Sequence, residues 1–93
     1  MNQHGSVRPH SSIKAVADKD GGVLLDGDRG LLFSLNEVGS TIWQRLTDGQ
    51  SIAEIVQAIA ERYTISRQQV EADVVAFIAD LESQHLLVRE RHE

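Results

Sequence analysis

The chain has 93 residues, enough for one small domain that buries about 60 to 65 % of its unfolded surface. It contains no cysteine, which excludes disulfides, thiolate metal sites and thiol nucleophiles and is typical of a reducing cytoplasm. Nine Lys and Arg against fourteen Asp and Glu give a formal charge of −5, so the field of the whole molecule repels nucleic acid and acidic membranes. No apolar run approaches the ~18 residues of a membrane span. We therefore expect a cytoplasmic domain with no nucleic-acid or membrane partner.

The first half of the chain predicts a tail and three strands. Residues 1–12 are polar and show no apolar period, which predicts a disordered tail. Residues 13–19 alternate weakly and residues 23–26 are short and apolar, as expected of two strands joined by a glycine-rich turn. Residues 27–30 supply the glycines of a hairpin that leads into a third strand at 31–35. The prediction is an antiparallel meander whose first and third strands lie at the edges.

In the second half the apolar period changes to that of helices, and we expect three of them, at 36–46, 51–63 and 66–83. Side chains that suit N-caps and capping boxes begin each helix: Asn36, the pair Ser51 and Glu54, and the pair Ser66 and Gln69. Residues 86–88 then close the domain, and residues 89–93 form a charged tail. The order of elements predicts an α+β domain at 13–88 of the winged helix-turn-helix type, with a three-stranded antiparallel sheet followed by three α-helices.

No catalytic or metal site is predicted. Asp26, Asp28 and Gly30 resemble the start of a calcium loop, but the distal glutamate and the other oxygen ligands do not follow at loop spacing, so a hairpin turn explains them better. The four histidines lie in predicted tails or, for His85, have no partner at ligand spacing. The serines are explained as caps, and no nucleophile elbow is present. We expect no enzyme activity, no cofactor and no metal.

A winged helix also suggests DNA binding, and the charges of the third helix argue against it. That helix carries four carboxylates against the single cation Arg67: Glu71, Asp73, Asp80 and Glu82. Because phosphate contacts dominate the affinity of DNA-binding proteins, a helix of this charge is a poor major-groove reader. DNA binding is kept only as a second alternative.

Two apolar features remain, the strand at 31–35 and a wide apolar face on the third helix. The strand has no charge or proline to discourage pairing with another chain. On the helix, Val70, Val74 and Phe77 are spaced to form one ridge, with Asp73 at its margin. One reading is that both features are simply core. The other is a peptide groove, in which a partner segment adds as a strand and places apolar side chains against the helix.

The same residues carry a resemblance to a known family, the PqqD-like proteins. The residues that match are Leu24-Leu25-Asp26, Gly30, Phe33-Ser34-Leu35-Asn36, Gly39, Ile42-Trp43, Leu46, Gly49, Ile55-Val56, Asp73-Val74, Phe77 and Leu81. The match covers about residues 13–88. It implies a RiPP recognition element, a non-catalytic module that binds the leader peptide of a ribosomally made precursor and delivers it to modifying enzymes. The peptide-binding residues implied are Leu31, Leu32, Phe33, Ser34, Leu35, Val70, Asp73, Val74 and Phe77.

Two branches of the family imply different partners. The stretch from Leu32 to Trp43 is more similar to lasso-peptide members, whose partners are a leader-cleaving cysteine protease and an ATP-dependent macrolactam cyclase. The other branch is a chaperone that presents its precursor to a radical SAM enzyme in pyrroloquinoline quinone biosynthesis. A further possibility is a structural subunit that joins two enzymes without touching the precursor. The lasso branch is favoured.

Overall fold

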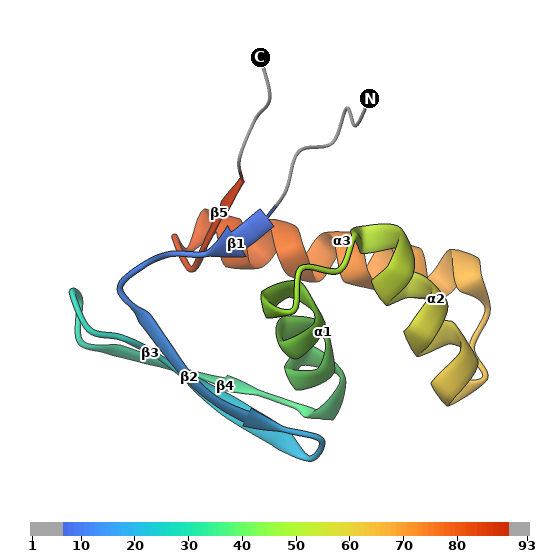
Figure 1. The fold of residues 1–93 in the computed structure, drawn as a ribbon, viewed down its shortest axis with the longest axis horizontal. Helices are drawn as coiled ribbons and strands as arrows, with labels where there is room; N and C mark the ends of the chain where they lie inside the picture. The colour runs from blue at the N-terminus through green and yellow to red at the C-terminus, as the bar shows by residue number, and fades with distance from the viewer. Residues whose placement is uncertain (1–6, 90–93) are drawn as a thin grey trace.

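The computed structural model describes residues 7–89, and in this range the three predicted strands and three predicted helices are confirmed (Figure 1). A further short strand lies at each end. The elements are β1 (Val7–Pro9), β2 (Ile13–Asp18), β3 (Gly21–Asp26), β4 (Leu31–Leu35), α1 (Glu37–Thr47), α2 (Ile52–Tyr63), α3 (Arg67–Ser83) and β5 (Leu87–Arg89).

The central sheet has the order β2-β3-β4 with both pairs antiparallel, so β2 and β4 are its edges, as predicted. The β2–β3 turn is set by Asp18, whose carboxylate accepts from the Asp20 N–H at 2.8 Å. The β3–β4 turn ends at Gly30, which has φ +67°, a conformation that other residues rarely adopt. The two turns fix the register and therefore which side chains share a face.

The helix starts follow the predicted caps, with one difference at α3. Asn36 accepts from the Gly39 N–H at 2.8 Å, and the Ser51–Glu54 capping box makes both of its bonds. Ser66 accepts from the Gln69 N–H at 3.2 Å, but the Gln69 side chain donates to Asp73 instead of returning to the cap. Only half of the second predicted capping box is formed.

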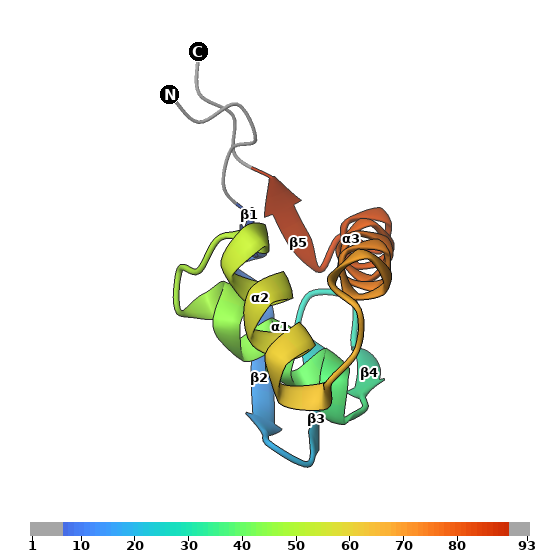
Figure 2. The same cartoon turned by 90° about the vertical axis from the view of Figure 1, so that its right-hand side faces the viewer.

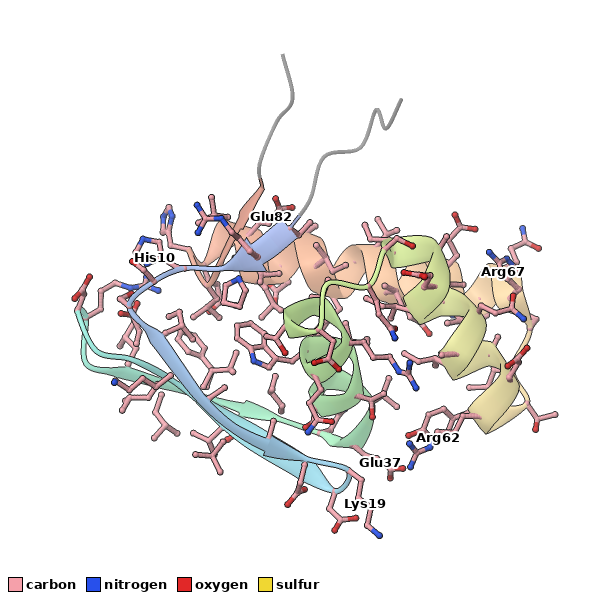
Figure 3. The ribbon with its side chains drawn as sticks, viewed as in Figure 1. His10, Lys19, Glu37, Arg62, Arg67 and Glu82 are labelled. Atoms are coloured by element: carbon pink, nitrogen blue, oxygen red, sulfur yellow. The ribbon has the colours of Figure 1, made fainter. Side chains whose placement is uncertain are left out.

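The core lies between the inner face of the sheet and the helices, with α1 in the middle (Figures 1 and 2). Trp43 of α1 is 3 % exposed and Leu24 of β3 is fully buried. The start of α1 is also joined to the end of α2, because Tyr63 donates its hydroxyl to Glu37 at 2.8 Å and Arg62 lies beside the same carboxylate (Figure 3). These contacts join α1 to α2 at one end of the helical part of the domain.

The two chain ends differ from the predicted tails. Val7–Pro9 pairs antiparallel with Leu87–Arg89, and the His10 N–H donates to the Leu86 carbonyl at 3.0 Å. The tail prediction is therefore wrong for residues 7–12, and Arg89 ends a strand. The remaining predicted tail residues, 1–6 and 90–93, lie outside the described part of the chain. Across residues 7–89, none of the helices has the length and apolarity that a membrane crossing needs.

Candidate functional site

The two edges of the sheet differ in how they are covered. On β2, the carbonyl of Ala17 accepts from the Gln44 side chain at 2.6 Å, and the carbonyl of Asp18 accepts from the Ser40 hydroxyl at 2.7 Å. Of these two carbonyls, that of Ala17 points outward from the sheet, whereas that of Asp18 lies at the β2–β3 turn, where the Ser40 hydroxyl also approaches the Gly21 carbonyl. A side chain of α1 thus occupies one acceptor at the end of the β2 edge. In contrast, within residues 7–89 no hydrogen bond from outside the sheet is recorded to the backbone of Leu31–Leu35. The β4 edge is therefore open along its whole length.

The phase of the hydrogen-bond ladder shows which β4 groups face outward. The Gly27 N–H donates to the Ser12 carbonyl at 3.1 Å, and bonded and non-bonded pairs alternate along an antiparallel ladder. Counting along the register from this pair, Leu24 directs its backbone groups toward β4, where it lies opposite Phe33. The backbone N–H and C=O groups of Leu32 and Ser34 therefore point away from β3, toward solvent.

In Figure 2, α3 runs beside β4, and this helix includes Phe77 and Asp73. A methyl group at Gly39 would lie only 3.2 Å from Phe77 Cε1 and Cζ, so the aromatic ring packs directly on the start of α1. Asp73, one turn earlier on α3, is exposed and accepts from Gln69 at 3.0 Å. The ring of Phe77 thus lies where β4 leads into α1, with the carboxylate of Asp73 one helical turn away on α3.

At the other end of β4, a polar cluster ties the β3–β4 turn to the end of α3. The buried carboxylate of Asp26 accepts from Arg29 Nε at 2.5 Å, from the Asp28 N–H at 3.0 Å and from the Ser12 hydroxyl at 3.2 Å. Arg29 also donates from Nη2 to the Gln84 carbonyl. The Arg29 guanidinium lowers the pKa of Asp26, and burial opposes this effect without reversing it. This cluster fixes the separation of β4 and α3 at one end, and the Phe77–Gly39 contact fixes it at the other.

The structure divides the nine predicted peptide-binding residues by exposure. Leu31, Leu32, Ser34 and Asp73 are exposed, and Phe33 and Phe77 are half-buried. Leu35, Val70 and Val74 are in the core, where Val70 is 2 % and Val74 is 1 % exposed. The predicted ridge of Val70, Val74 and Phe77 is thus corrected, because α3 turns its two valines inward and only Phe77 is left at the surface.

Sequence reasoning missed Arg29, Gly39 and Gln84. Arg29 lies three residues after Asp26 across a turn, a spacing at which a local ion pair could have been expected. Gly39 stands one turn into a helix, where glycine is unfavourable, and that cost is a signal of close packing. The role of Gln84 depends on its backbone carbonyl, which no side-chain pattern reveals.

The fold and the site define a small α+β domain with an open strand edge at β4 and the ring of Phe77 beside the end of that strand. Among residues 7–89, no three His, Asp or Glu side chains gather closely enough to hold a metal ion. The chain belongs to the PqqD family, described as "Coenzyme PQQ synthesis protein D (PqqD)", which matches residues 21–87.

The chain is similar to proteins of both branches of this family. A "PqqA binding protein" of Rhodopseudomonas palustris (strain TIE-1) is 30 % identical over 82 residues, which are 88 % of this chain and 78 % of the relative. The structure of "Lasso peptide synthetase B1 complexed with the leader peptide" superposes with a TM-score of 0.83 at 31 % identity, covering 89 % of this chain and 98 % of that one. "TbiB1 in Complex with the TbiA(beta) Leader Peptide" gives a TM-score of 0.84 at 33 % identity, covering 91 % and 99 %.

Proposed function

We propose that this domain binds the leader peptide of a ribosomally made precursor, which adds as a strand to the open edge of β4. The observation that carries the proposal is the β4 edge itself, where within residues 7–89 the outward backbone groups of Leu32 and Ser34 have no partner, whereas the Ala17 carbonyl at the β2 edge accepts from Gln44 of α1. Two similar solved structures contain a leader peptide, and the R. palustris relative is named for binding PqqA, which supports the same role here.

The outward backbone groups of Leu32 and Ser34 would supply the hydrogen bonds of the added strand. Backbone bonds of this kind give affinity with little dependence on sequence, and side-chain contacts at alternate positions give specificity. The inward-facing side chains of the leader would meet Phe33 of β4 and Phe77 of α3, both half-buried. Asp73 would accept from a hydroxyl, amide or cationic group of the leader at the margin.

The proposed role is recognition without catalysis, followed by delivery of the precursor to modifying enzymes. The similar structure that is named a lasso peptide synthetase B1 is covered over 98 % of its chain, which favours a leader-cleaving cysteine protease and an ATP-dependent macrolactam cyclase as partners. The alternative is presentation of a PqqA-type precursor to a radical SAM enzyme, which the R. palustris relative favours. The genes that neighbour this one decide between the two branches.

The test is a titration of a fluorescent leader peptide, encoded beside this chain, into the purified protein. We expect saturable binding with one peptide per domain, accompanied by slower hydrogen exchange at the Leu32 and Ser34 amides. Protection confined to β2 would place the peptide on the other edge. A titration without any anisotropy change would reject leader binding. A shift of promoter DNA that weakens steeply with salt would instead support the DNA-binding alternative.

A further inference from the structure

The strand β2 is the second edge of the sheet, on the far side from β4. The hydrogen-bond phase that orients β4 also orients β2, so its odd-numbered residues, Ile13, Ala15 and Ala17, direct their backbone groups outward. The Ile13 N–H donates to the His10 carbonyl at 3.0 Å, and the Ala17 carbonyl accepts from Gln44 at 2.6 Å. Within residues 7–89, no hydrogen bond from outside the sheet is recorded to either backbone group of Ala15. The middle of this edge therefore has unused donors and acceptors.

The helices do not cover the sheet as far as the β2 edge. Ala15 lies opposite Leu24 and so points to the same face, yet Leu24 is fully buried and Ala15 is exposed. On the other face, which is turned away from the helices, Val16 is 80 % exposed. Both faces of β2 thus leave room beside the strand for another strand.

The charges of β2 are self-complementary. Lys14 and Asp18 lie two residues before and two residues after Val16, and all three side chains share the face turned away from the helices. If β2 meets a copy of itself antiparallel with Val16 opposite Val16, each Lys14 lies directly opposite the Asp18 of the other copy. Charges on an edge strand normally discourage pairing, but this arrangement makes two attractive cross-strand pairs of them. Within residues 7–89, no ion pair is recorded for Lys14.

We propose that two copies of the domain associate through β2, antiparallel and with Val16 opposite Val16, so that the two three-stranded sheets join into one continuous sheet. In this register Ala15 lies opposite Ala17 of the second copy, and both direct their backbone groups to the shared edge. The Ala15 N–H donates to the Ala17 carbonyl, which has two lone pairs and keeps its bond to Gln44. The Ala17 N–H donates to the Ala15 carbonyl, and two-fold symmetry repeats both bonds.

The occupant of this edge is a second copy because β2 itself supplies what the pairing needs. An added strand satisfies both charges only if it carries a cation and a carboxylate four residues apart, and Lys14 and Asp18 have this spacing. The side chains that meet on the helix-facing side are small, since both are alanines, Ala15 and Ala17. The joined sheet keeps a β4 edge at each end, so the dimer has two open edges. The inference does not depend on leader binding at β4.

An introduced cysteine reports the register directly, because the chain has no cysteine of its own. A residue that faces itself in a non-hydrogen-bonded antiparallel pair has Cα atoms about 4.5 Å apart, within the range of a disulfide. The test compares Val16→Cys with Val75→Cys, which changes a half-exposed valine of α3, using oxidised glutathione as the oxidant. We expect Val16→Cys to form disulfide-linked dimers at least about tenfold faster, because only this position faces itself in the dimer. Equal rates would overturn the proposal.

Two further changes, made in the Val16→Cys protein, test the pairing of charges. Lys14→Asp places two carboxylates opposite each other at both ends of the shared edge, and we expect cross-linking to slow at least about fivefold. Arg67→Asp, at the start of α3 (Figure 3), changes the net charge equally and leaves β2 unaltered, so cross-linking should stay within about twofold of the parent. Equal slowing by both changes would also overturn the proposal, since repulsion between whole molecules would then explain it.

The cross-linked dimer is finally titrated with the fluorescent leader. We expect one leader per domain with the affinity of the wild type, because both β4 edges stay open. A cross-linked dimer that excludes the leader would place the interface at β4 and contradict the proposal. Failure of the wild type to bind leader would reject the leader function alone, and the cross-linking rates would still decide whether β2 pairs with itself.

Discussion

Replacing Ser34 by proline tests strand addition, because it removes the outward backbone N–H to which the leader strand would bond. The Ser34 N–H points away from β3, so proline removes no bond within the sheet, and an edge strand tolerates a proline whose missing N–H faces solvent. We expect the free energy of unfolding to change by less than about 1 kcal/mol. A backbone hydrogen bond contributes about 1 kcal/mol net, so the lost donor alone weakens the leader about fivefold. If the proline ring also prevents the leader from bonding to the backbone of Leu32, the loss of binding free energy rises to about 3 kcal/mol, or about 150-fold in affinity.

Fluorescence anisotropy gives the affinity, and thermal unfolding of the same samples shows that they are folded. Ser34→Ala is the matched control, because it removes the hydroxyl and keeps the N–H, and we expect it to bind the leader like the wild type. Two results would refute the reasoning. An unfolded Ser34→Pro protein would mean that this N–H points into the sheet, and a folded one with unchanged leader affinity would mean that the peptide binds elsewhere.

Three further variants test the surroundings of the edge. Asp73→Ala should leave the melting temperature nearly unchanged and weaken the leader by about 1 to 3 kcal/mol, as for a lost charge-assisted bond, and equal affinity in the same titration would remove Asp73 from the site. Gly39→Ala gains about 1 kcal/mol of helix propensity, but its methyl group presses on the half-buried Phe77. The free energy of unfolding should therefore change little while the leader affinity falls. Unaltered affinity would show that leader binding does not depend on the position of the Phe77 ring. The lowered pKa of Asp26 stabilises the folded protein above the ordinary aspartate pKa of about 4, and this stability is lost as the pH falls below it. Between pH 7 and pH 3 the melting temperature should therefore fall more steeply for the wild type than for Asp26→Asn. Parallel curves would contradict this.

The sheet and the helix starts were predictable because their signals are local. Asn36 caps α1 and Ser51 caps α2 through contacts within four residues, and such contacts depend only on the immediate sequence. The second half of the Ser66 capping box failed for an equally local reason, because Asp73 lies one turn from Gln69 and competes for its amide. A pattern of two residues does not include that competitor.

Features that depend on distant parts of the chain were not predictable. Val7–Pro9 has no apolar period, and it becomes a strand only because Leu87–Arg89 lies beside it. The apolar face of α3 was recognised, but helical spacing does not say which flank is covered, and the packing of Val70 and Val74 against the other helices decides that. The open edge was the part of the site that could be predicted, because the sequence alone shows that Leu31–Leu35 contains no charged residue and no proline.

The pairing of β1 with β5 has a practical consequence for protein engineering. Val7 lies opposite Arg89, so the described chain enters and leaves the domain at the same place, away from β4 (Figure 1). A two-residue turn from 89 to 7 would convert the two strands into a hairpin, and new ends could be opened in the exposed loop at Asp48 and Gly49. Such a circular permutant would keep the β4 edge intact and would let a fused enzyme be attached beside α1 instead of at the paired ends.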